Sequence, residues 1–250
     1  MRNALLKAFS FALLLGTLAS CQKEYSIEGY SLNGPNVPPT NPPTNPPTNP
    51  PTNPPGTQTD CDMCEYIPTC DGSTYTYQDV MFGMSSTRNV TLTYIRDTTI
   101  NGIVFQRITD GTNPQGTYFN CTNGVTRVIS YGNTTSGGQN ISVADLVMLK
   151  SNEPVGATWT SVIDQTAGQQ ALYEFEIIAK GISRTVLGTT YNDVIQVKQI
   201  MSAVVMGTSI VMADSDYYYA RNVGLIEVVM LNTTTGAQDG LSQLQTYNIP

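Results

Sequence analysis

Histidine is absent from the 250-residue chain, and tryptophan occurs only once. Without an imidazole the chain has no Ser-His-Asp triad, and it lacks the commonest general base of enzymes. A glycine-rich phosphate loop is missing too, so we expect a protein that is not an enzyme and holds no metal or other cofactor. Carboxylates remain, and a pair about 5 to 10 Å apart across a groove would favour the remote alternative, a carbohydrate-active enzyme.

Positive charge is scarce. The chain has 12 Lys and Arg residues against 19 Asp and Glu residues, a net charge of −7. Arg2 and Lys7 belong to the N-terminal leader, and without them the net charge is −9. Nucleic acid and anionic lipid headgroups are therefore poor partners, because like charges repel.

The leader also lacks a long hydrophobic run. Its apolar core, residues 8–17, is shorter than the about 20 residues of a membrane-spanning helix, but it suits a secretory signal. Leu18, Ala19 and Ser20 then precede Cys21, which resembles the bacterial lipobox. The resemblance implies that residues 1–20 are removed as a lipoprotein signal peptide. It also implies that Cys21 receives a diacylglyceryl group on its sulfur and a palmitate-type chain on its amine, which together hold a protein to membrane lipid. The alternative is an ordinary signal peptide whose cleavage site happens to carry a cysteine.

The residues after Cys21 indicate in which membrane the lipoprotein resides. Gln22 is not the aspartate that retains many lipoproteins in the inner membrane, which favours the outer membrane. Lys23 and Glu24 resemble the short export tag of surface lipoproteins in the Bacteroidetes. Both cell-surface display and the periplasmic face of the outer membrane stay open.

A proline-rich repeat separates this tether, residues 21–34, from the rest of the chain. Residues 35–59 contain four copies of Pro-Pro-Thr-Asn. Proline fixes its own backbone angle and has no N–H to donate, so this linker cannot form a helix or a central strand. We expect a disordered, semi-rigid stalk, in which Pro35 to Pro55 would span roughly 65 Å at full extension, at about 3.1 Å per residue. A docking site for a proline-binding domain is the competing interpretation.

Residues 60–250 form strand-like patterns almost throughout. Tyr173, Phe175 and Ile177 alternate with charged residues, and turn signals such as Asn101-Gly102 and Asn123-Gly124 separate such runs. A short helix at residues 142–149 is the one exception we expect. The pattern predicts an all-β domain, either an antiparallel sandwich or a strongly curved, partly closed barrel.

Three segments of this domain resemble a known pattern. A Val-Gly-x-x-Trp strand at residues 155–159, a Gly-Thr-Thr-Tyr hairpin at 188–191 and a Tyr-x-Ala-x-x-Val-Gly-Leu strand at 218–225 follow one another. This order is similar to that of uncharacterised secreted lipoproteins of bacteria, with Asn222 where glycine or proline is frequent. The resemblance implies an antiparallel β fold and no particular activity.

The domain contains four cysteines besides Cys21. An even number in an exported chain favours two structural disulfides over a zinc site or a redox pair. We prefer Cys61–Cys64 with Cys70–Cys121, although Cys61 or Cys64 could equally reach Cys121. A bridge between Cys70 and Cys121 would contribute about 4 kcal/mol through loop entropy.

Tyrosines and aspartates near residue 215 are the weak candidates for a ligand site. Tyr217 and Tyr219 could stack on sugar rings, and we expect at least one of residues 217–219 on the outer face or in a cleft. Cross-strand packing is the alternative for these tyrosines. Asp214 and Asp216 resemble a calcium-friendly loop but lack the ligand spacing of a calcium motif, so an exposed turn is the preferred interpretation.

Two functions from different classes fit these features. The first is a lipid-anchored lipoprotein that displays a non-enzymatic binding or accessory domain for a glycan, a lipid or an envelope protein. The second is a structural or envelope-maintenance lipoprotein without a small ligand.

Overall fold

The computed structural model describes residues 64–110, 116–131, 143–164, 170–205 and 207–250. These residues form strands and no helix. The strands are β1 (Thr74–Met81), β2 (Met84–Thr91), β3 (Thr93–Ile100), β4 (Ile103–Thr109), β5 (Thr117–Thr122), β6 (Val125–Tyr131), β7 (Val143–Lys150), β8 (Thr158–Asp164), β9 (Gln170–Val186), β10 (Thr189–Val205), β11 (Thr208–Ala220), β12 (Gly224–Leu231) and β13 (Gln238–Asn248). The predicted signal peptide, tether and stalk, residues 1–20, 21–34 and 35–59, lie outside the described residues.

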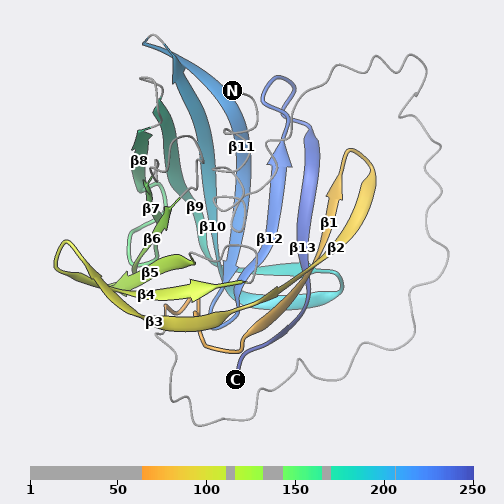
Figure 1. Cartoon of the computed structure of the whole chain (residues 1–250). Coiled ribbons are helices and arrows are strands. Elements are labelled where there is room, and N and C mark those ends of the chain that lie inside the picture. The colour runs from red at the N-terminus through yellow and green to blue at the C-terminus, as the bar shows by residue number, and fades with distance from the viewer. Residues whose placement is uncertain (1–63, 111–115, 132–142, 165–169, 206) are drawn as a thin grey trace, which may run out of the picture.

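The strands form two antiparallel sheets. The larger has the order β2-β1-β13-β12-β11-β10-β9-β8, and the smaller has the order β3-β4-β5-β6-β7. The smaller sheet is inserted in the sequence between β2 and β8, and the pairing of β1 with β13 joins the two parts of the larger sheet. Figure 1 shows β3, β4 and β5 running across the long strands of the larger sheet. The all-β antiparallel prediction is confirmed, and the two sheets are not closed into a barrel.

Strand β9 shows why these sequences fold as strands. Tyr173, Phe175 and Ile177 are buried, whereas Glu174 between them is exposed. Successive side chains of a strand point to opposite faces, so this alternation gives one face to the core and the other to solvent. The predicted two-residue period is confirmed.

The short helix expected at residues 142–149 is wrong. From Val143 onward this segment is strand β7, which pairs with β6 from Tyr131 to Val125. Leu146 and Met148 are buried two positions apart, as a strand requires. The segment forms a strand because it pairs with β6 and packs its apolar side chains into the core, and these tertiary contacts outweigh any local helical preference.

Tight hairpins connect most neighbouring strands. The predicted turns Asn101-Gly102 and Asn123-Gly124 join β3 to β4 and β5 to β6, and all four residues have positive φ. This is the conformation of two-residue turns that match the twist of the strands. Phe82-Gly83 and Leu187-Gly188 adopt it too, with φ values of 48° and 47° at Phe82 and Leu187. The sequence did not mark these two turns, because such bulky residues rarely adopt positive φ.

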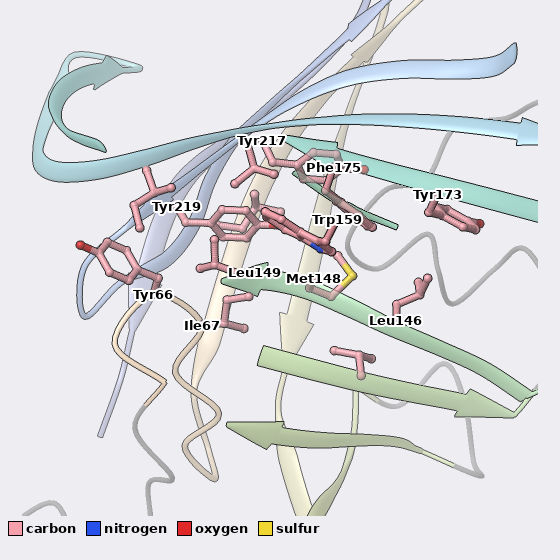
Figure 2. Close-up of a cluster of buried hydrophobic side chains, with 14 of the residues drawn as sticks. Tyr66, Ile67, Leu146, Met148, Leu149, Trp159, Tyr173, Phe175, Tyr217 and Tyr219 are labelled. Carbon is pink, nitrogen blue, oxygen red and sulfur yellow. The ribbon is translucent and has the colours of Figure 1, made fainter. Parts of the chain in front are cut away.

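A first cluster of buried side chains fills the space between the sheets (Figure 2). The ring of Trp159 on β8 stacks on Phe175 with centroids 5.3 Å apart. The indole Nε1 donates a hydrogen bond to the Val147 carbonyl on β7 at 2.7 Å, and the Val147 N–H donates to Ser161 Oγ at 3.2 Å. These bonds join the two sheets along the side of β7 and β8.

A second cluster belongs to the larger sheet and includes Tyr75, Tyr77 and Leu244. The end of the β9–β10 hairpin supplies Val186 and Tyr191 to it. Pairing shifts between Tyr191 and Val197 interrupt the ladder, and such bulges bend a strand. Figure 1 shows the hairpin, in cyan, bent beneath β12 and β13.

Residues 64–73 enter the domain between the two sheets. Tyr66 and Ile67 belong to the first cluster, and Thr69 Oγ1 donates a hydrogen bond to Gln106 Oε1 on β4 at 2.8 Å. The Gly72 N–H donates to the Leu92 carbonyl, and the Leu92 N–H donates to the Ser73 carbonyl. The start of the described domain is thus fixed to both sheets before the first strand begins.

Candidate functional site

An apolar cleft lies between the sheets beside β1 and β2, on the side of the domain away from the β7–β8 contact. Its walls come from β1, β2, β4, β5, the start of β12 and the segment before β1, and its volume is about 80 Å³. The apolar wall residues include Ile67, Tyr75, Val90, Ile108, Phe119 and Leu225. A concave apolar surface with a few polar groups is typical of small-molecule sites.

Two tyrosines of β1 form one wall. Tyr75 and Tyr77 lie two positions apart and therefore on one face, opposite Val90 and Arg88 of β2. The Tyr77 hydroxyl donates a hydrogen bond to the Leu225 carbonyl at 3.0 Å, which fixes the ring. Burial raises the pKa of both phenols above the ordinary value of 10.0, so both stay neutral near pH 7.

Arg88 is the cation of the cleft. Its Nε donates to Asp79 Oδ2 at 3.0 Å, and its Nη2 donates to Asp79 Oδ1 at 3.4 Å and to Ser242 Oγ at 3.2 Å. The guanidinium carbon lies 4.6 Å from the centroid of the Tyr77 ring. The charge of Arg88 is therefore balanced by one carboxylate and held in place over an aromatic face.

The structure places the predicted tyrosines in the core. Tyr217 and Tyr219 are 2% and 1% exposed, and their rings stack in the first cluster with centroids 6.2 Å apart (Figure 2). Tyr218 lies on the other face of the sheet, but it is buried as well, with the Arg184 guanidinium 4.2 Å from its ring centroid. Tyr218 therefore faces away from the first cluster, as the alternation predicts, but it is not exposed, because the bent β9–β10 hairpin brings Arg184 over its ring.

The two aspartates lie within strand β11, so the exposed-turn interpretation is also wrong. The Lys198 Nζ lies 2.6 Å from Asp214 Oδ1, and Lys198 is the direct cross-strand partner of Asp216. Lys198 thus forms a cross-strand ion pair with Asp214 and lies directly opposite Asp216 in the sheet. Among the residues that the structure describes, no group of three or more His, Cys, Asp or Glu side chains could hold a metal ion.

The cysteines differ from the preferred pairing. Cys64 forms a disulfide with Cys121, with Cα atoms 5.6 Å apart, which contradicts both Cys61–Cys64 and Cys70–Cys121. Our alternative in which Cys64 reaches Cys121 is confirmed. Cys70 is also disulfide-bonded, whereas Cys21 and Cys61 lie outside the described residues. The preferred pairing failed because residues 64–73 pass beside β5, which no local spacing reveals.

Arg221 holds the entry segment to the larger sheet. Its guanidinium forms ion pairs with Glu65 and with Asp193, and its Nη2 donates to the Tyr66 hydroxyl at 2.9 Å. The Tyr66 hydroxyl donates to Asp193 Oδ1 at 2.8 Å. Burial and this bond to Asp193 raise the pKa of Tyr66 to about 12. The hydrogen bonds from Arg221 and Tyr66 lower the pKa of the Asp193 carboxyl.

This cleft was not predicted from the sequence. Arg88, Ile108 and Leu225 come from three parts of the chain, and only the fold brings them to one cleft. The available signal was the tyrosine pair itself, two positions apart after Gly72. No helix in the described part of the chain is long and apolar enough to cross a membrane.

The chain matches no protein-family model and no curated protein. Two solved structures are similar to it. One is a candidate lipoprotein from Parabacteroides distasonis, with 14% identity, a TM-score of 0.44 and coverage of 75% of this chain and 100% of that one. The other is a candidate exported protein with a YmcC-like fold from Bacteroides fragilis, with 11% identity, a TM-score of 0.41 and coverage of 73% and 98%. Neither identifies a family or an activity for this chain.

Proposed function

We propose that the chain is a lipoprotein of the cell envelope, attached to membrane lipid through Cys21. The observation that carries the proposal is the order of segments: a basic and apolar leader, Cys21 after small residues, a Pro-Pro-Thr-Asn stalk and then the β domain. Each segment has a use in this scheme, since the leader exports, the cysteine anchors and the stalk spaces the domain from the lipid.

The attachment of the domain to its entry segment supports this arrangement. Cys64 is bonded to Cys121, and Glu65 and Tyr66 are held by Arg221. A force applied through a lipid anchor and a stalk would reach the domain at these residues. Because covalent and ionic contacts hold them to both sheets, the entry segment would not peel away from the core.

We assign the domain a non-enzymatic binding or accessory role. The cleft beside β1 and β2 supports binding, since it is apolar and concave and a hydrogen bond holds the Tyr77 ring in its wall. The outer membrane is the proposed location, on the grounds of Gln22, and cell-surface display is proposed from Lys23 and Glu24.

Metabolic labelling with an alkyne analogue of palmitate tests the anchor. Wild-type protein should incorporate the label and sediment with membranes, and Cys21→Ser should lose both properties. Cys61→Ser is the matched control and should keep the label. Incorporation of label by Cys21→Ser would overturn the proposal. Protease treatment of intact cells then decides between surface and periplasmic display.

The anchor proposal also assigns the partner of Cys70. Cys64 and Cys121 are bonded to each other, so Cys21 and Cys61 are the cysteines left for Cys70. If lipid occupies Cys21, the bond must be Cys61–Cys70. Peptide mapping of the non-reduced protein should find this pair, and a Cys21–Cys70 peptide would contradict the anchor.

A further inference from the structure

The cleft beside β1 and β2 has room for a small apolar group. Its volume of about 80 Å³ is roughly half that of an engineered cavity of roughly 150 Å³ that binds benzene. A complete lipid chain is too large for this space, whereas the end of a short acyl chain fits. The wall side chains Tyr75, Val90 and Ile108 are all buried, and the hydrogen bond from Tyr77 to Leu225 fixes another part of the wall.

The polar groups of the cleft restrict the charge of its ligand. Asp79 occupies the Nε and Nη2 positions of Arg88, so the guanidinium charge is already balanced. A carboxylate ligand would bring an unbalanced negative charge into an apolar space, which is costly.

Arg88 nevertheless keeps one nitrogen that can donate a hydrogen bond to a ligand. Its Nη1 donates to no acceptor among the described residues, while its Nε and Nη2 are used. Its side chain is 31% exposed and lines the cleft. An uncharged acceptor oxygen, such as an ester carbonyl, can take this hydrogen bond without adding charge.

From this combination we propose that the cleft binds a short-chain acyl ester of an uncharged alcohol. The acyl chain lies against Tyr75, Val90 and Ile108, and the ester carbonyl accepts a hydrogen bond from Arg88 Nη1. The inference rests on the proposed binding role of the domain and names its ligand class. A peptide fits less well, because each of its carbonyls comes with an N–H that needs an acceptor of its own.

Nuclear magnetic resonance of the full chain carrying Cys21→Ser tests the proposal without detergent. The probes are 1-butyrylglycerol, the anion butyrate and the amide N-acetylvalinamide. Addition of 1-butyrylglycerol should shift the methyl signals of Val90, Ile108 and Leu225 saturably, and butyrate and N-acetylvalinamide should bind at least about tenfold more weakly. The exposed Ile210 on the β10–β11 hairpin should not shift.

Two matched substitutions on β2 locate the site. Val90→Phe fills the cleft and should weaken 1-butyrylglycerol binding by at least about tenfold, whereas Thr91→Phe places the same ring at the adjacent, exposed position and should leave it unchanged. The proposal would be overturned if butyrate or N-acetylvalinamide bound as tightly as 1-butyrylglycerol or more tightly. It would also be overturned if 1-butyrylglycerol shifted signals outside the cleft in the chain that keeps Val90. Because the wild-type cleft is mapped directly, a Val90→Phe chain that fails to fold leaves the test intact. The anchor is tested separately by lipid labelling, so the two proposals fail in different experiments.

Discussion

Removal of the Cys64–Cys121 disulfide should destabilise the domain strongly. We consider the double variant Cys64→Ser with Cys121→Ser. The bond joins residues 57 positions apart, and closing a loop of this length restricts the unfolded chain by about 4 kcal/mol in the loop-entropy model. Thr126 Oγ1 donates to Cys64 Sγ at 3.3 Å, and the serine oxygen can keep this bond. The loss is a large fraction of the about 5 to 15 kcal/mol that stabilises most domains.

Urea unfolding followed by tryptophan fluorescence measures this loss. Trp159 is the one tryptophan and lies buried against Phe175, so its emission reports the core. The double variant should unfold at lower urea with a steeper dependence on denaturant, because its unfolded state is less compact. Reduction of the wild type also breaks the bond of Cys70, so the double variant is the cleaner comparison. A loss below about 1 kcal/mol would refute the loop-entropy argument.

Three further predictions concern the turns and the titrating groups. Leu187→Asn should stabilise the domain by up to about 1 kcal/mol and raise the melting temperature, because Leu187 is exposed and has positive φ, which asparagine tolerates better. Asp193→Asn should destabilise the domain at pH 7. The hydrogen bond from Arg221 lowers the pKa of Asp193 in the folded state. The stabilisation of the fold by the Asp193 carboxylate is therefore fully present above the pKa of Asp193 in the unfolded chain, and it is lost as pH falls through the pKa of Asp193 in the folded chain. The difference between variant and wild type in urea unfolding should therefore shrink below about pH 4. Burial raises the pKa of Tyr77 and Tyr217, so stability should fall as pH rises above about 10, where the unfolded tyrosines ionise. Ultraviolet titration should show these phenols ionising together with unfolding, and independent ionisation near pH 10 in the folded protein would contradict their burial.

The strand pattern was predictable because it is a local property. Alternating residues in β9 and the Asn-Gly turns each depend on neighbours in the sequence, and the structure confirms both. Two segments of similar sequence, Gly-Ser-Thr-Tyr-Thr-Tyr at residues 72–77 and Gly-Ala-Thr-Trp-Thr-Ser at residues 156–161, also share a conformation. Gly72 and Gly156 have φ values of 78° and 83°, and each precedes a strand by two residues.

The cysteine pairing and the cleft were not predictable, because both depend on contacts between distant segments. Cys64 meets Cys121 only because residues 64–73 enter between the sheets. The alternation of residues 217–219 indicated that Tyr218 faces away from its neighbours, but not that Arg184 from a bent hairpin covers it. A local pattern fixes the face of a side chain, whereas the covering of that face is decided by tertiary structure.

The most direct test of the central claim is mass spectrometry of the N-terminal peptide of the protein isolated from membranes. The mature chain should begin at Cys21 and carry a diacylglyceryl group on sulfur and an acyl chain on the amine. A mature chain that begins elsewhere, or an unmodified Cys21 in the membrane-isolated protein, would contradict the claim.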